Sequence, residues 1–376
     1  MAGIYVHVPF CVSKCSYCDF YSVANLKKQQ DYVAALKKEI EVRRYELEGQ
    51  SVDTIYWGGG TPSLLSDRQV VDVMTLLRGT YNISKGAEIT IECNPGDYNA
   101  TKVANLIRSG GFNRFSIGAQ SFSDKILAFL GRRHSVRETI EMYKSVRDLG
   151  VSNVSLDLIY GIPDTTLSDL NRDLDTLISL YPTHISAYHL IFEEGTPMTY
   201  ALEQGRFDQL PEDKSLEMSH LVSKRLEQTG YEHYEVSNYS LPGMRSRHNS
   251  SYWADITYIG FGPSAHSYTD PWRSSNPADL DYYTESFLRH GFLLRNFEYI
   301  TDDIRFEEYL MTRLRTSDGI SLDTVRVRFG EAKTDTLAQR LSPFISNGLI
   351  CVKSDGHLAL TQAGIDISDT IISSLF

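Results

Sequence analysis

Three of the five cysteines in this 376-residue chain lie close together, in the order Cys11-x3-Cys15-x2-Cys18. Such crowding is more typical of metal ligands than of a disulfide scaffold. Cysteine thiolates bind iron–sulfur clusters, and a cubane cluster has four irons. The three cysteines therefore predict a [4Fe–4S] cluster that leaves one iron open for a second molecule. A zinc site completed by His7 or Asp19, or three incidental cysteines, are the alternatives.

A glycine-rich segment, Trp57-Gly-Gly-Gly-Thr-Pro62, follows the second apolar run of the chain. Glycine has no side chain, so the backbone N–H and C=O groups of such a segment can approach a ligand closely. A tight turn without a ligand is an equally simple interpretation of these residues alone. Their position one repeating unit after the cysteines favours a second contact with the same ligand.

The elements that must hold these motifs repeat along residues 3 to 191, where short β-branched or aromatic runs alternate with longer amphipathic runs. This alternation is typical of βα units around a parallel sheet. The six predicted strands are Gly3–Phe10, Asp53–Gly59, Glu88–Asn94, Arg114–Gln120, Val154–Gly161 and His184–Ile191. The predicted helices between them include Tyr32–Leu47, Asp67–Leu77, Val136–Leu149 and Ser168–Leu180, with capping residues such as Ser66 and Ser135.

The third, fourth and fifth predicted strands each have one polar face, because side chains alternate between the two faces of a strand. Glu92, Gln120 and Asp157 lie on these polar faces. Parallel sheets covered by helices on both sides are normally apolar on both faces. A consistently polar face therefore predicts a partial (β/α)6 barrel of the TIM type, with a polar ligand in the lumen near the C-terminal ends of the strands.

The pattern changes after residue 195, and the chain is long enough for a barrel and a smaller second domain. We expect a barrel over residues 1–195, an extension over 196–300 and a separate domain over 301–376. The extension is predicted to hold a helix at Glu212–Thr229 and a loop-rich stretch from Tyr231 to Tyr283. The last domain is predicted to hold the helices Ile304–Leu314, Leu322–Phe329 and Asp335–Asn347, the hairpin Leu349–Leu360 and a final helix. The expected fold class is α/β, with a helical, winged-helix-like domain at the C-terminus.

The charge balance argues against nucleic acid as a partner, because 37 basic residues face 48 acidic residues and the formal net charge is −11. For the same reason we expect the winged-helix-like domain to pack against a partner or the barrel. No apolar run is long enough to span a bilayer, and the N-terminus does not read as a secretory leader. We therefore expect a cytoplasmic protein without a membrane span.

The cysteine spacing, the aromatic Tyr17 before the third cysteine and the glycine-rich segment resemble the radical SAM superfamily. In that family, S-adenosylmethionine chelates the open iron through its amino and carboxylate groups, and one electron from the cluster cleaves it to a 5′-deoxyadenosyl radical. The resemblance implies that S-adenosylmethionine contacts Tyr5, Tyr17, Gly59, Gly60, Thr61, Glu92, Gln120, Arg132 and Asp157. Chemically, acids and amides can bind ribose hydroxyls, and Arg132 can pair with the methionine carboxylate.

Longer segments resemble a narrower group, which contains the oxygen-independent coproporphyrinogen III dehydrogenases (HemN) and the HemW haem chaperones. These segments are YVHVPFC from Tyr5, GGGTP from Gly58, RFSIGAQ from Arg114 and DLIYGIP from Asp157. The dehydrogenase has a further cysteine where this chain has Phe20. The chain also begins ten residues before the first cluster cysteine, without room for the long N-terminal segment of the dehydrogenase. Both departures argue against decarboxylase activity.

The segment Arg247-His-Asn-Ser-Ser-Tyr-Trp253 matches the His-Asn-x-x-Tyr-Trp signature of the HemW type. The resemblance implies that His248 can ligate haem iron and that Tyr252 and Trp253 offer flat surfaces for a porphyrin. His266 is a rival candidate for the iron ligand.

Taken together, these resemblances imply a haem chaperone, which carries haem from a donor to an acceptor protein as a monomer or a haem-linked dimer. The cluster and S-adenosylmethionine would control assembly or release. The alternatives are oxidative decarboxylation of coproporphyrinogen III and, disfavoured by the acidic charge, radical modification of RNA. The sequence leaves open whether any radical turnover occurs.

Overall fold

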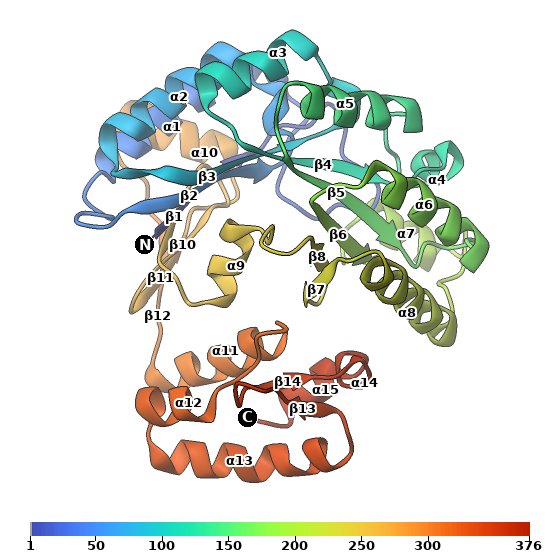
Figure 1. The fold of residues 1–376 in the computed structure, drawn as a ribbon. Coiled ribbons are helices and arrows are strands. Elements are labelled where there is room, and N and C mark those ends of the chain that lie inside the picture. Colours follow the sequence, from blue (N-terminus) through green and yellow to red (C-terminus); the bar gives the residue numbers. More distant parts are fainter. Residues whose placement is uncertain (1) are drawn as a thin grey trace.

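The computed structural model describes residues 2–376, and its centre is a curved sheet whose six consecutive βα strands follow the order of the chain (Figure 1). These strands are β1 (Ala2–Val8), β2 (Val52–Gly59), β3 (Ile83–Cys93), β4 (Arg114–Gln120), β5 (Asn153–Tyr160) and β6 (His184–His189). Each strand pairs in parallel with the next. The predicted α/β class and partial barrel are confirmed.

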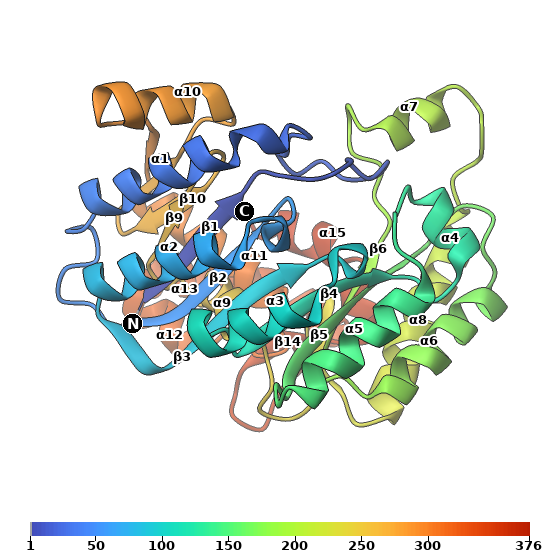
Figure 2. The ribbon, with the colours of Figure 1, turned by 90° about the horizontal axis from the view of Figure 1, so that it is seen from above.

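Helices cover the outer face of this sheet (Figure 2). Several of them begin directly after a capping residue. The principal helices are α1 (Gln29–Val42), α2 (Asp67–Thr80), α5 (Val136–Asp148) and α6 (Leu167–Leu180). Ser66, Ser135 and Thr166 each form a capping box with the residue three positions later, which satisfies backbone N–H groups at the helix start. Val73 and Leu77 of α2 are fully buried in the core beneath.

The sheet continues at both edges, so that it has twelve strands in all. At one edge β9 (Tyr258–Phe261) pairs in parallel with β1 and is followed by the antiparallel strands β10 (His266–Thr269), β11 (Trp272–Ser275) and β12 (Asn296–Tyr299). At the other edge β8 (Asn238–Ser240) and β7 (Glu232–Glu235) follow β6. The stretch from Tyr231 to Tyr283, predicted to be rich in loops, also contains short strands and the helix Arg247–Trp253, which were not predicted. These strands have only three or four residues each, which is too short for a period-two pattern to stand out, and β9 forms by pairing with β1, which lies at the other end of the chain.

A buried carboxylate attaches the extension to the barrel. Glu39 of α1 is 0% exposed and accepts hydrogen bonds from Arg43 Nη1 (2.8 Å), the Gly262 N–H (2.8 Å), Asn276 Nδ2 (2.8 Å) and the Tyr283 hydroxyl (2.7 Å). Three of these donors belong to the segment after β9. Because each donor satisfies a lone pair of the buried charge, the contact fixes this edge of the sheet against α1.

Residues 302–373 form a compact unit below the concave face of the sheet (Figure 1). Its elements are α11 (Asp302–Leu314), α12 (Leu322–Phe329), α13 (Glu331–Ser346), β13 (Ile350–Val352), β14 (Leu358–Leu360), α14 (Gln362–Ile365) and α15 (Ser368–Ser373). Leu310, Leu341 and Ile371 lie in a core of its own. The predicted helices and hairpin of this region are present. Backbone contacts join it to β7, including Ser317 N–H to Tyr234 O at 2.9 Å.

The remaining helical elements are shorter or lie at the periphery. They are α3 (Ala100–Asn105), α4 (Asp124–Phe129), α7 (Pro197–Glu203), α8 (Glu212–Gln228), α9 (Arg247–Trp253) and α10 (Leu280–Glu285), with single turns at Leu26–Lys28, Pro62–Leu64, Pro95–Asp97, Leu106–Gly110 and Ser286–His290. Within residues 2–376, no helix has both the length and the apolar character needed to cross a bilayer. Of these elements, α9 lies on the concave side of the sheet (Figure 1).

Candidate functional site

The three clustered cysteines lie in a loop that follows β1 and is closed at its base. The Cys11 N–H donates to Val23 O (3.1 Å) and the Val23 N–H donates to Pro9 O (2.7 Å). A turn then brings the Cys18 N–H to Cys15 O at 3.3 Å. All three thiols are half-buried and line one cavity at the C-terminal ends of the strands.

The surroundings of the thiols suit a positively charged centre. Burial, together with the neighbouring Cys15 and Cys11, raises the pKa of Cys18 to about 11. Arg132 Nη1 donates to Cys15 Sγ at 3.5 Å, and Cys11 Sγ lies 3.7 Å from Thr61 Oγ1. Three thiolates this close together repel one another, so a cationic group must hold them deprotonated, and an iron–sulfur cluster is such a group.

The zinc alternative fits this arrangement poorly. Both ring nitrogens of His7 have protein partners, Nδ1 with the Tyr5 hydroxyl (3.1 Å) and Nε2 with Tyr21 O (2.9 Å). Across residues 2–376, no three His, Cys, Asp or Glu side chains are grouped around one point as the ligands of a single metal ion would be. A cubane takes its thiolates on different irons and needs wider spacing. The donor set therefore suits a cluster better than a single zinc ion.

The glycine-rich segment packs directly against the cysteine loop. Gly59 has a φ of +105°, and a Cβ atom there would lie 2.6 Å from the His7 ring. A Cβ at Gly60 would lie 2.6 Å from Phe10 O. Only glycine fits at these two positions, and the backbone of the segment consequently borders the cavity.

Glu92 lies in the lumen beside this segment. Its Oε1 accepts from the Tyr56 hydroxyl (2.8 Å) and its Oε2 accepts from the Gly59 N–H (3.2 Å). Burial raises the pKa of Glu92 to about 7, and the nearby charge of Asp157 adds to the shift. Above this pKa, the ionised Glu92 can accept further hydrogen bonds from a ligand.

Asp157 offers a second acceptor from β5. Burial raises its pKa to about 6, against the opposing effect of Arg114 and of three serine hydroxyls. Ser116 Oγ and Ser155 Oγ donate to Oδ1 at 3.3 and 3.4 Å. Arg114 is 1% exposed, and its Nε and Nη1 atoms have no hydrogen-bond partner. The guanidinium thus acts on the lumen carboxylates through its charge alone.

Gln120 reaches the cavity through an irregularity at the end of β4. The pairing of β4 with β5 shifts between Ile117 and Gln120, and Gln120 has a φ of +65°. Such a bulge turns a side chain away from its regular direction, and strained backbone of this kind is common at binding sites. Arg132 Nη2 donates to Gly118 O at 2.8 Å, which places the guanidinium between β4 and Cys15.

The structure brings almost all the predicted cofactor residues to one cavity of about 430 Å³. The predicted residues that line it are Cys11, Cys15, Tyr17, Cys18, Gly59, Gly60, Thr61, Glu92, Gln120, Arg132 and Asp157. Tyr5 does not line it, because its register partner on β2 is Tyr56, deeper in the lumen than Gly59. Tyr188 and Ile191 line the cavity and were missed, although the alternation of β6, with His184, Ser186 and Tyr188 on one face, would have indicated Tyr188.

The His-Asn-x-x-Tyr-Trp segment forms α9, which fills the lower lumen. His248 is 1% exposed, with Nδ1 hydrogen-bonded to Thr54 Oγ1 (2.8 Å) and Nε2 to the Tyr252 hydroxyl (2.9 Å). Burial lowers the pKa of His248 to about 3, so the ring is neutral. His266, by contrast, is exposed on β10.

Tyr252 and Trp253 line a second cavity of about 480 Å³ between α9, the β6–β8 edge and the C-terminal unit. This cavity shares Tyr188 and Ile191 with the cofactor cavity, so the two are neighbours. Asn249 of α9 and Arg315 of the C-terminal unit also line it.

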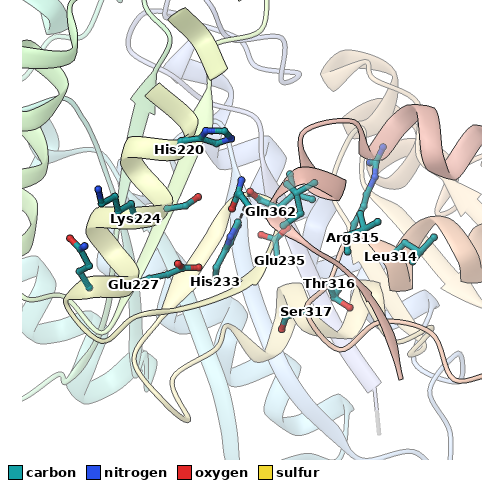
Figure 3. Close-up of a pocket in the computed structure, with 15 residues that line it drawn as sticks. His220, Lys224, Glu227, His233, Glu235, Leu314, Arg315, Thr316, Ser317 and Gln362 are labelled. Atoms are coloured by element: carbon teal, nitrogen blue, oxygen red, sulfur yellow. Dashed lines mark hydrogen bonds between the residues drawn. The ribbon is translucent and has the colours of Figure 1, made fainter. Parts of the chain in front are cut away.

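A third and larger cavity, of about 740 Å³, lies between α8, β7 and the C-terminal unit (Figure 3). His220 and Lys224 of α8, Glu235 of β7 and Arg315 on the opposite side line it. No residue predicted from the sequence lines this cavity. Its mixture of positive, negative and apolar groups does not single out a class of ligand.

Comparison with known proteins places the chain in a family. Residues 5–177 match the radical SAM superfamily, and residues 300–367 match the HemN C-terminal domain. The chain is 32% identical to the haem chaperone HemW of Bacillus subtilis over 368 residues, which are 97% of this chain and 96% of that protein. The chain belongs to the HemW family. It is also 40% identical to the haem chaperone HemW of Escherichia coli over 271 residues, 70% of this chain and 69% of that protein.

A solved structure shares the fold of this HemW-family chain. Coproporphyrinogen III oxidase (HemN) from Escherichia coli, a radical SAM enzyme, superposes with a TM-score of 0.85 and 23% identity, over 100% of this chain and 89% of that chain. At this identity the likeness shows the fold alone. Membership of the radical SAM superfamily implies a [4Fe–4S] cluster and S-adenosylmethionine, which the donor set and polar lumen described above fit.

Proposed function

We propose that this HemW-family chain is a haem chaperone, which binds haem as cargo and passes it to an acceptor protein. The observation that carries the proposal is the position of Tyr252 and Trp253 in a cavity that adjoins the cofactor cavity through Tyr188 and Ile191. Flat aromatic rings beside a cavity of about 480 Å³ suit a porphyrin. The name of the curated relatives supports the same function.

The residues at the barrel mouth have separate roles in this proposal. Cys11, Cys15 and Cys18 would hold the cluster. Arg132 would pair with the carboxylate of S-adenosylmethionine, and Glu92 and Asp157 would accept hydrogen bonds from its hydroxyls. When bound, the cluster and S-adenosylmethionine together would supply one-electron chemistry at the barrel mouth.

His248 would act as the axial ligand of haem iron. Its Nε2 atom is hydrogen-bonded to the Tyr252 hydroxyl, so this hydroxyl must move away before Nε2 can bind the haem iron. The neutral imidazole that burial maintains is the form that binds iron. Tyr252 therefore both offers a porphyrin contact and covers the ligating nitrogen.

Phe20 argues against oxidative decarboxylation as the function. It is 64% exposed at the rim of the cofactor cavity, where the dehydrogenase has a cysteine. A phenyl ring offers no thiolate to a metal or a radical. Turnover of coproporphyrinogen III by the wild type would show that decarboxylation does not need a cysteine at position 20.

The proposal is tested by anaerobic reconstitution of the cluster followed by haem titration. We expect a Soret band in the wild type, a weaker or shifted band in His248→Ala, and no change in His266→Ala. Cys15→Ala should lose the absorbance of the cluster, whereas Cys351→Ala, at an exposed position of β13, should retain it. If the wild type converts coproporphyrinogen III and binds no haem, the chain is a coproporphyrinogen III dehydrogenase and not a haem chaperone.

A further inference from the structure

We infer that Tyr56 is a positioning residue that couples the cofactor cavity to α9, so that S-adenosylmethionine and haem each change the affinity for the other. The inference rests on the haem-chaperone function proposed above. Tyr56 lies on the lumen face of β2, between Glu92 of the cofactor cavity and His248 of α9. It contacts both residues.

The contacts of Tyr56 hold these two residues together. Its hydroxyl donates to Glu92 Oε1 at 2.8 Å, and its ring stacks on the His248 ring with 5.2 Å between centroids and 24° between planes. Tyr5 stacks on both rings, at 6.2 Å from Tyr56 and 6.5 Å from His248. A displacement of Tyr56 therefore changes the surroundings of His248 directly.

The arrangement seen here is a closed one for haem. The two ring nitrogens of His248 are occupied by Thr54 and Tyr252, and iron ligation has to break the bond to Tyr252 and shift α9. Because Glu92 anchors the Tyr56 hydroxyl, the Tyr56 ring stays flat against His248. The anchor thus favours the closed position of α9.

A bound ligand at Glu92 would weaken this anchor. Both carboxylate oxygens already accept a hydrogen bond, Oε1 from Tyr56 and Oε2 from the Gly59 N–H. A carboxylate has about four acceptor sites, so ribose hydroxyls that donate to the free sites of Glu92 would draw its carboxylate toward the cofactor and away from the Tyr56 hydroxyl. S-adenosylmethionine therefore favours release of His248 and raises haem affinity, and haem must raise the affinity for S-adenosylmethionine by the same factor.

The test compares Tyr56→Phe with Tyr81→Phe in cluster-loaded protein. Tyr56→Phe removes only the hydroxyl and keeps the ring that packs on His248. Tyr81→Phe is the control. It also removes a buried hydroxyl, but this hydroxyl donates to Arg43 O at 3.1 Å and contacts neither Glu92 nor His248. Haem affinity is measured from the Soret band with and without S-adenosylmethionine, and S-adenosylmethionine affinity by equilibrium dialysis with and without haem.

In the wild type and in Tyr81→Phe, we expect S-adenosylmethionine to raise haem affinity about 5-fold or more. In Tyr56→Phe, haem affinity should already be raised without S-adenosylmethionine, and the added effect should disappear. If neither ligand changes the affinity of the wild type for the other, the inference is wrong. It is also wrong if S-adenosylmethionine raises the haem affinity of Tyr56→Phe as much as that of the wild type. If the wild type binds no haem at all, the proposed function fails instead.

Discussion

Arg132 Nη1 donates to the Sγ atom of Cys15 at 3.5 Å, while its Nη2 donates to Gly118 O at 2.8 Å. The guanidinium thereby joins the cysteine loop to β4, the strand that also carries Gln120. Two segments far apart in sequence are held at one wall of the cofactor cavity. A planar group with several donors can keep both contacts and still pair with a carboxylate.

Arg132→Lys should weaken S-adenosylmethionine binding about 10- to 100-fold, because a single ammonium cannot replace the fork of donors at this position. Iron and sulfide content should stay near wild type, since the three cysteines are unchanged. Arg137→Lys, at an 82% exposed position of α5, is the matched control and should bind S-adenosylmethionine as the wild type does. The measurement is equilibrium dialysis of reconstituted protein under argon. If the two variants bind S-adenosylmethionine with equal affinity, Arg132 does not contact it.

The affinity for S-adenosylmethionine should depend on pH through Glu92. Its pKa of about 7 means that the carboxyl takes up a proton as the pH falls from 8 to 6 and loses acceptor capacity. We expect affinity to fall about 10-fold over this range, since one pKa unit corresponds to a factor of ten. Glu92→Gln should bind more weakly at pH 8 and show a flatter profile. A wild-type profile without slope between pH 8 and 6 would exclude Glu92 as an ionised contact.

Gly59→Ala should destabilise the protein by about 1–3 kcal/mol, because the backbone has a φ of +105° and the new Cβ would meet the His7 ring at 2.6 Å. It should also impair cluster assembly, since His7 and Gly59 pack beside the cysteine loop. Gly79→Ala, in α2 with open space around the new Cβ, should instead stabilise by about 0.5–1 kcal/mol. Denaturant unfolding of the two variants makes the comparison. If Gly59→Ala has the same free energy of unfolding as the wild type, the backbone at this turn can change its conformation to accept a Cβ atom.

Glu39→Ala should cost about 3–5 kcal/mol, because it removes one of the two carboxylates that pair with the buried Arg43, leaving only Glu46, and it removes the acceptor of three further donors. Glu41→Ala, two residues along the same helix, removes a carboxylate that pairs with Lys38 at a half-exposed position and should stay within about 0.5 kcal/mol of wild type. Thermal unfolding distinguishes them. Similar melting temperatures for both variants would mean that β9 and the segment after it are held to the barrel by other contacts.

Local sequence determined the cysteine loop, the glycine-rich segment and the polar faces of β3, β4 and β5. These features follow from spacing, from the absence of a Cβ and from the two-residue period of a strand, all of which act between near neighbours. The bounds of β4 and α12 agree with the prediction residue for residue. For the same reason, Glu92 and Asp157 could be assigned to the lumen without any structure, whereas Gln120 reaches the cavity through the irregularity at the end of β4.

Tertiary structure decided what depends on pairing between distant segments. Alternation gives the face of a strand but not its depth in the lumen, which is set by register, and so Tyr5 lies beside Tyr56 instead of in the cofactor cavity. The pairing of β9 with β1 and the burial of Glu39 need partners more than a hundred residues away. The placement of His248 against Tyr56 depends on α9 entering the barrel, a long-range packing event that no local pattern specifies.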